Sequence, residues 1–198
     1  IREAVVRSHA RAVEQMILVG NSADGIYGTS GAAPNGLIAD AIADSDKTQH
    51  ATAFASHPDM VATELLAARK NMGKYGVRPT DIIFIVSLDK YHELIADTAY
   101  ADASQVEGLA TKLTGQVGQV YGTPVIVSEE FAAAATSKFY AIAVNPRNYV
   151  IPRLRGVTVE SDYEVANQRR VLVATQRIGF SDVIDNVTSK WGLQFKAS

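Results

Sequence analysis

Apolar side chains recur at helical spacing through the first eighteen residues of the chain. The stripe consists of Val5, Val6, Ala10, Val13, Ile17 and Leu18. Such spacing is typical of an amphipathic helix, and Glu3 and Arg7 stand at the i,i+4 positions that favour an ion pair. Gly20 and Asn21 then break the pattern. The sequence therefore predicts a helix over 1–18, followed by a glycine-rich connector over 20–36.

The next part of the chain has a weaker pattern. Residues 37–57 are rich in Ala and Asp and fit either a broken helix or a loop. A clear helical pattern begins at His57-Pro58, because proline suits the first helical turn and Asp59 favours its positive end. We expect this helix to end at Gly73 or Gly76.

An uninterrupted apolar run at 82–86 predicts a strand that is buried on both faces. Residues 88–96 then predict a short helix, and a further helix is possible at 105–114. Residues 119–128 predict a strand that a glycine and a proline interrupt, so that its first half is an edge or a bulge.

From residue 138 onward the pattern changes to that of strands. Short strands are predicted at 138–145, 148–152 and 190–197, and two long strands around a polar turn at 156–183. In the first long strand Val157, Val159 and Ser161 alternate with Thr158 and Glu160. Helices come first and strands mostly last, which predicts an α+β fold.

Composition excludes several classes of protein. Of its 198 residues, 47% are hydrophobic and 20% are charged, which is an ordinary composition for a globular protein. The net charge is −2, and the sequence lacks the basic stripe that a nucleic-acid-binding protein needs. There is no cysteine, so disulfides and thiolate metal sites are excluded. No signal peptide is recognisable and no apolar run approaches the roughly 20 residues that span a bilayer. Because the chain enters a helix directly at Ile1, we expect a fragment or a processed product.

No motif predicts chemistry. His9, His50, His57 and His92 match no metal-binding spacing, and we expect them at surface or helical positions. The glycine-rich 25–31 matches neither common phosphate-binding loop and is predicted to be a connector.

Carboxylates cluster at Glu129-Glu130 and at Glu160, Asp162 and Glu164. Alternating acids at a strand end are more typical of a solvated or partner-facing rim than of a glycosidase pair. We therefore predict no catalytic residue, no metal site and no cofactor, and a protein that is not an enzyme.

The order of four segments carries a resemblance. They are AVEQMILVGNSADGIYGTSGAAPNGLI, DIIFIVSLDKYHELI, YGTPVIVSEEF and the long stretch from Phe139 to Asp185. The third has a G-x-PV-x-x-S pattern, formed by Gly122, Pro124, Val125 and Ser128. In this order the segments resemble the major capsid proteins of tailed bacteriophages, which have the Hong Kong ninety-seven-type fold. The resemblance covers essentially the whole chain.

The resemblance implies a peripheral domain in two parts, 1–57 and 147–198, with a long helix and a β-ribbon. An axial domain of mixed sheet and flanking helices, 58–146, would be inserted between them. The loop 97–118 would point towards the ring axis, and the turn 160–168 would reach neighbouring rings near the threefold positions. The family's N-terminal arm and extended loop are not found before Ile1.

The function implied is that of a structural subunit of an icosahedral capsid, of a tailed phage or prophage. Such subunits self-assemble into pentamers and hexamers that enclose DNA without sequence-specific binding. Scaffolding and portal proteins would be further partners. The protein would be located in the virion, which would be assembled in the bacterial cytoplasm. No membrane partner is implied. Alternatives are an encapsulin-type nanocompartment shell, a small α+β enzyme, and a phage tail or adaptor component.

Charged residues gather around the predicted ribbon turn, and we expect them to include contacts between subunits. They are Arg153, Arg155, Glu160, Asp162, Glu164, Arg169 and Arg170. We also expect the ribbon to fold back onto the opening helix, while the middle of the chain forms a lobe of its own.

Overall fold

The computed structural model describes residues 2–20, 34–96, 118–185 and 187–196. Its helices are α1 (Arg2–Leu18), α2 (Leu37–Ala43), α3 (Ala62–Asn71) and α4 (Leu88–Ala96), with short 3-10 turns at Phe54–Ser56, Gly73–Gly76, Pro79–Asp81, Pro146–Asn148 and Val165–Asn167. Its strands are β1 (Lys47–Ala53), β2 (Ile83–Ser87), β3 (Gln119–Val120), β4 (Thr123–Ser128), β5 (Phe139–Val144), β6 (Tyr149–Val150), β7 (Arg153–Glu164), β8 (Arg169–Ile178), β9 (Ser181–Asp182) and β10 (Lys190–Lys196).

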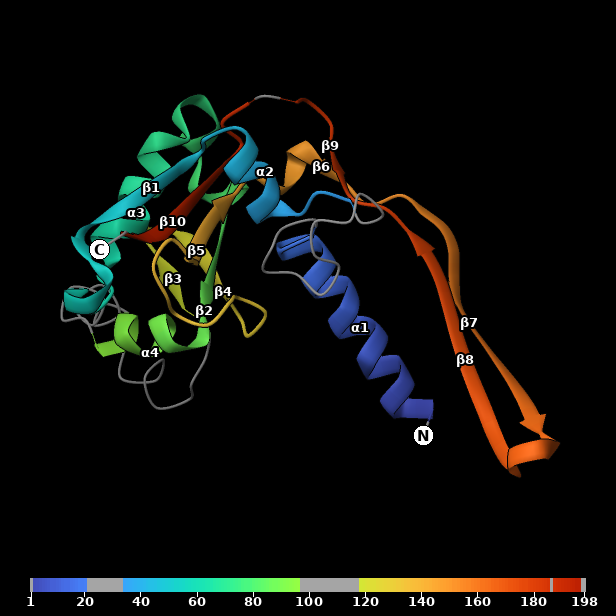
Figure 1. Cartoon of the computed structure of the whole chain (residues 1–198). Helices are drawn as coiled ribbons and strands as arrows, with labels where there is room; N and C mark the ends of the chain where they lie inside the picture. The colour runs from blue at the N-terminus through green and yellow to red at the C-terminus, as the bar shows by residue number, and fades with distance from the viewer. Residues whose placement is uncertain (1, 21–33, 97–117, 186, 197–198) are drawn as a thin grey trace.

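A six-stranded mixed sheet in the order β1-β10-β5-β2-β4-β3 forms the body of the molecule (Figure 1). One apolar cluster packs α3 and α4 on one face, and a second packs α2 and the end of α1 on the other. Strand β2 contributes to both clusters, with Phe84 and Val86 fully buried and Ile83 and Ile85 partly buried. The predicted two-sided burial of this strand is therefore confirmed, more completely on one face than on the other.

Helix α1 agrees with the sequence prediction, including a 2.7 Å ion pair between Glu3 and Arg7. At its end Gly20 has a φ of +56°, and a Cβ there would overlap the Gly36 backbone. Glycine is therefore required where the chain returns from the connector to the end of the helix. The possible helix at 105–114 lies outside the described residues.

Three elements differ from prediction. Helix α3 begins at Ala62 rather than Pro58, because the Met60 amide bonds to Glu93 on α4 and keeps the preceding chain extended. Residues 119–128 form a hairpin rather than one interrupted strand, with positive φ at both Tyr121 and Gly122. Lys47–Ala53 is an edge strand, β1, which the polar sequence KTQHATA did not reveal.

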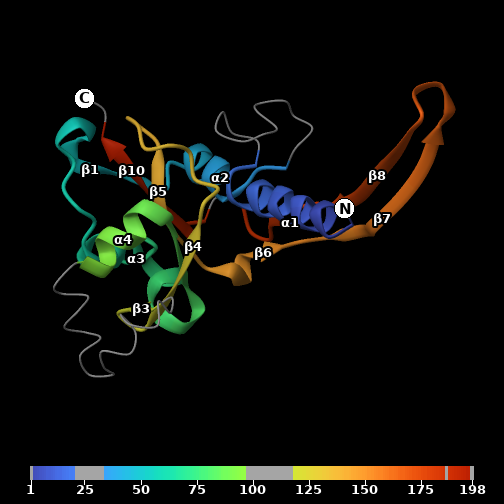
Figure 2. The ribbon, with the colours of Figure 1, turned by 90° about the horizontal axis from the view of Figure 1, so that it is seen from below.

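Strands β7 and β8 form a separate antiparallel ribbon that projects from the body on the same side as α1 (Figures 1 and 2). The two predicted long strands are thereby confirmed. The predicted packing against the opening helix is limited to the base, where Met16, Leu18 and Phe180 share a buried cluster that Ile178 joins. Along the rest of β7 nearly every residue is exposed, so the expected fold-back of the ribbon onto α1 does not extend beyond the base.

The six-stranded sheet contains strands from all three ranges of the domain prediction. Strands β1 and β10, from 1–57 and 147–198, lie in one sheet with β2 and β4 from 58–146. The predicted boundaries therefore do not separate two sheets, and the division into peripheral and axial domains stays a prediction about the assembled state. None of the described helices has the length and apolar character needed to cross a membrane.

Candidate intersubunit surface

The ribbon is anchored to the body through a narrow neck. Strands β6 and β9 pair there, and the Tyr149 and Phe180 rings stack with centroids 5.1 Å apart. The buried Asn148 donates from its side chain to the Ile184 carbonyl (3.0 Å) and accepts from the Ile184 amide (3.2 Å). These contacts fix the direction in which the ribbon leaves the body.

Beyond the neck the ribbon exposes many large apolar side chains. They are Leu154, Val157, Val159, Tyr163, Val165, Val171 and Val173, and Leu154 is 80% exposed. An isolated two-stranded ribbon is marginally stable in water, and contiguous exposed apolar residues are typical of contact sites. The ribbon therefore carries surfaces that this chain alone does not cover.

The strand register separates two faces with different chemistry. The acidic face carries the register pairs Glu160–Val173, Asp162–Val171 and Glu164–Arg169. The tyrosine face carries Val159–Ala174, Ser161–Leu172 and Tyr163–Arg170. Directly opposed residues of an antiparallel pair point to the same side, so the carboxylates of the ribbon share one face.

Four of the seven predicted contact residues pair within the chain. Arg169 Nε lies 2.5 Å from Glu164 Oε2, and an Arg155 guanidinium nitrogen lies 3.7 Å from Glu160 Oε1. Three of the four side chains are largely exposed and Glu164 is partly exposed, and pairs at the surface stabilise a fold by about 0–1 kcal/mol. These pairs can therefore be exchanged for contacts with another molecule at little cost.

The other three have no ion-pair partner within the part of the chain that the structure describes. They are Arg153, Asp162 and Arg170, although Asp162 Oδ1 accepts a hydrogen bond from the Tyr163 amide at 2.8 Å. Whether these seven residues contact other subunits stays a prediction.

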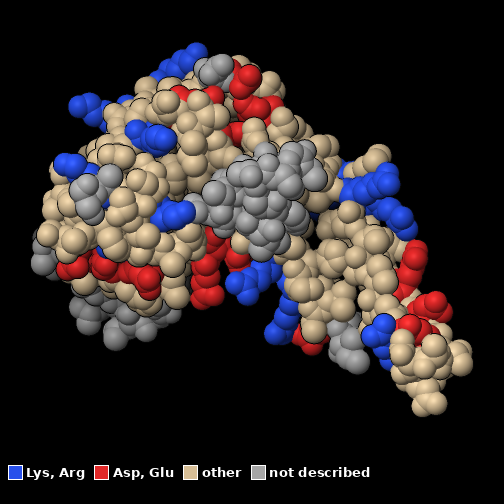
Figure 3. Space-filling model, viewed as in Figure 1, with Lys and Arg blue, Asp and Glu red and all other residues tan. Residues whose placement is uncertain are grey.

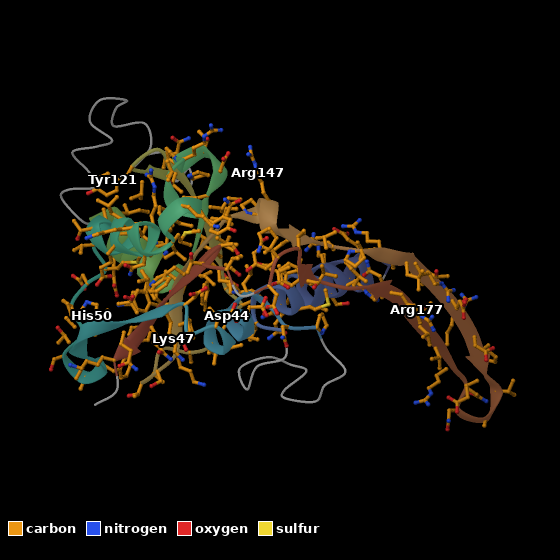
Figure 4. All side chains as sticks on the ribbon, turned by 90° about the horizontal axis from the view of Figure 1, so that it is seen from above. Asp44, Lys47, His50, Tyr121, Arg147 and Arg177 are labelled. Atoms are coloured by element: carbon orange, nitrogen blue, oxygen red, sulfur yellow. The ribbon has the colours of Figure 1, made fainter. Side chains whose placement is uncertain are left out.

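Basic residues gather where the ribbon leaves the body, and acidic residues lie farther along it (Figure 3). Arg155 and Arg177 are direct register partners, and Figure 4 shows Arg177 on the ribbon outside the body. Like charges directly opposed across two strands are unfavourable. The ribbon base therefore favours an anionic partner.

A second uncovered surface lies between α1 and the sheet. Ala10, Val13 and Ile17 face Ile85 and Ile126 across an apolar groove of about 330 Å³. At its margin the Ser128 hydroxyl donates to Glu14 at 2.7 Å. Helix α1 is therefore bonded to the body at the margin of the groove but is not fully packed against the sheet.

The predicted histidine positions need a correction. His50 lies on β1 and His57 in the extended segment before α3, and both are partly buried rather than at surface or helical positions. Their ring centroids lie 4.0 Å apart, because the 3-10 turn Phe54–Ser56 between β1 and this connector lets the chain change direction there. Among the described residues no three His, Asp or Glu side chains are placed to hold a metal ion.

The fold is that of viral capsid chains. The capsid of a native GTA particle matches over 99% of this chain and 64% of its own, with a TM-score of 0.62 and 18% identity. The capsid of cyanophage Pam1 matches over 96% of this chain and 65% of its own, with a TM-score of 0.60 and 13% identity. No family model matches the chain.

In sequence, the chain is 32% identical to the major capsid protein of Escherichia phage T5 over 186 residues. The match covers 94% of this chain and 39% of the T5 protein, so the chain spans about two fifths of that relative. Together the sequence and the fold confirm the predicted resemblance to tailed-phage major capsid proteins and the predicted α+β class.

Proposed function

We propose that this chain forms the larger part of the folded shell-building region of a phage or prophage major capsid protein, which self-assembles into pentamers and hexamers of an icosahedral shell. The observation that carries the proposal is 32% identity to the T5 major capsid protein over 94% of the chain. The role is structural rather than catalytic, and the encapsulin alternative is not favoured, because the relatives named above are capsids of phages and of a GTA particle.

The geometry supports assembly through contacts between different surfaces of identical chains. Closed rings need such heterologous contacts, and many weak ones together stabilise a shell. The ribbon supplies two surfaces of opposite charge, an arginine-rich base and the acidic face. We propose that the acidic face of one copy meets the arginine-rich base of another, which would place the seven charged residues at or near intersubunit contacts.

The remaining expectations follow the resemblance. In the assembled shell, 58–146 would act as the axial domain, and the ranges 1–57 and 147–198 as the peripheral domain. Scaffolding and portal proteins would be partners, and the shell would enclose DNA in a virion assembled in the host cytoplasm. The net charge of −2 suits a wall that encloses DNA without binding a specific sequence.

The test is a charge swap in the full-length parent protein, with negative-stain microscopy as the readout. The wild type is expected to form closed shells. The triple variant Glu160→Arg, Asp162→Arg, Glu164→Arg is expected to form none, and combining it with Arg153→Glu, Arg155→Glu, Arg177→Glu is expected to restore some. The exposed Asp59→Arg is the control and should assemble normally.

Each result decides a different part of the proposal. Unchanged shells in the triple variant would overturn the acidic face as a contact. A wild type that forms only tubes, open rings or dispersed monomers would overturn the shell function itself.

A further inference from the structure

Two histidine rings from different segments lie against each other at one end of the body. His50 comes from the edge strand β1 and His57 from the connector before α3, with ring centroids 4.0 Å apart. The His57 ring also lies against Tyr140 on β5 and Phe195 on β10, at 5.5 and 4.8 Å. The label in Figure 4 places His50 at the far end of the molecule from the ribbon.

The hydrogen bonds of His50 define its protonation. The Thr52 amide donates to His50 Nδ1 at 3.0 Å, so this nitrogen carries no proton. His50 Nε2 lies 2.6 Å from Glu64 Oε1 and must therefore carry the proton that it donates. A second proton, on Nδ1, would break the hydrogen bond to the Thr52 amide.

His57 has no such partners. Both of its ring nitrogens are buried, and neither makes a hydrogen bond within the described part of the chain. Burial lowers the pKa of His57, as do the neighbouring His50 and Lys90, while the Pro58 backbone and Glu93 act in the opposite direction. The neutral ring is therefore the form that this environment accepts.

The carboxylates nearby are already engaged. Glu64 on α3 bonds to His50 and accepts from the Tyr140 hydroxyl at 3.4 Å, and burial raises its pKa. Glu93 on α4 bonds to Lys90 at 2.6 Å and accepts from the Met60 amide at 2.9 Å. Neither carboxylate makes a hydrogen bond to His57, so the buried ring has no side-chain acceptor among the described residues.

We propose that the His50–His57 contact is an acid-sensitive latch, which holds the connector 54–61 against the body while the His57 ring is neutral and releases it when that ring is protonated. The latch joins β1, the connector and α3. The inference stands on this chain's own contacts and does not depend on the proposed function.

The expected pH dependence follows from the lowered pKa of His57. When the connector is open, His57 has the ordinary histidine pKa of 6.5, and when it is closed, the pKa of His57 is lower. The closed state is therefore fully favoured above pH 6.5 and loses stability as the pH falls below it. For one proton, opening should increase by at most about tenfold between pH 7.5 and 5.5.

Amide hydrogen exchange by NMR tests this directly. The reporters are the amides of Thr52, His57 and Met60, whose acceptors are His50 Nδ1, the Phe54 carbonyl and Glu93 Oε2. Their protection factors, corrected for intrinsic exchange, should fall by up to about tenfold over that range, while amides of β5 stay protected. His57→Phe, which fills the aromatic surroundings and cannot be protonated, should abolish the fall.

His92→Gln, on the exposed side of α4, is the matched control and should behave as the wild type. If His57→Phe does not fold, His57→Gln gives the same test with a smaller polar side chain. A variant at position 57 that keeps the wild-type fall overturns the latch, as does an NMR titration in which His57 protonates at or above pH 6.5.

Discussion

Two strands of this chain, β5 in the body and β7 in the ribbon, differ in what covers them. All six residues of β5 are buried between two apolar clusters. Strand β7 also carries apolar side chains, among them Leu154, Val157 and Val159, yet ten of its twelve residues are exposed. The comparison teaches that the body covers its own apolar strand, whereas the apolar side chains of the ribbon are left uncovered by the described part of this chain.

The largest expected difference in stability comes from shortening one apolar side chain in each of the two regions. Phe84→Ala, in the buried body, should lower the free energy of unfolding by about 3–5 kcal/mol, because it leaves a cavity. Leu154→Ala, at the exposed ribbon, should change it by less than about 0.5 kcal/mol. Urea denaturation of both variants checks this. A cost at Leu154 as large as that at Phe84 would mean that the ribbon folds onto the body in solution.

An intermediate effect is expected at the junction between the two regions. Asp40 on α2 has its pKa raised from 3.8 to about 6, first by burial and also by Asp182, Asp44 and Asp185, whereas Lys190 opposes the rise. A raised carboxyl pKa means that the native state binds more protons than the unfolded state between pH 4 and 6. Its contribution is therefore favourable below that window and is lost as the pH rises through about 6.

Asp40→Asn should accordingly stabilise the protein at pH 7.5 by about 1 kcal/mol, a figure reduced because the side chain is only half-buried. The difference from wild type should vanish near pH 4. Urea midpoints at the two pH values provide the measurement, with the exposed Asp59→Asn as control. A variant that is less stable than wild type at pH 7.5 would show that the ionised Asp40 is held by Lys190 instead.

The smallest expected effect lies at the ribbon tip. Glu164→Gln removes the exposed 2.5 Å pair with Arg169 and should change the free energy of unfolding by at most about 1 kcal/mol. The measured change should be smaller in 0.5 M salt, because the salt screens this ion pair in the wild type and leaves less for the substitution to remove. A loss well above this size would indicate that the tip has a partner even in the dispersed chain.

Much of the element order could be predicted from the sequence, since it depends on local signals. Helix α4 spans the predicted 88–96, and the long ribbon strands are found where alternation and a polar turn indicated them. The start of α3 was missed by four residues, because the Met60–Glu93 bond that delays it joins residues far apart in the sequence. Strand β1 was missed since an edge strand with one solvated side needs few apolar residues.

The candidate surfaces, too, could be predicted from the sequence only in part. Charge around the ribbon turn is visible in the sequence, but the separation into an acidic and a tyrosine face required the register of β7 against β8. The His50–His57 contact could not be predicted, because no motif links two histidines that meet only through the turn between β1 and the connector.

By itself the sequence determined where most helices and strands form, and it identified the resemblance to phage capsid proteins, because periodicity, turn residues and short motifs are properties of neighbouring residues. Only the tertiary structure decided which apolar side chains are covered. Burial depends on which surface lies opposite, so apolar side chains are core in β5 and open to solvent in β7.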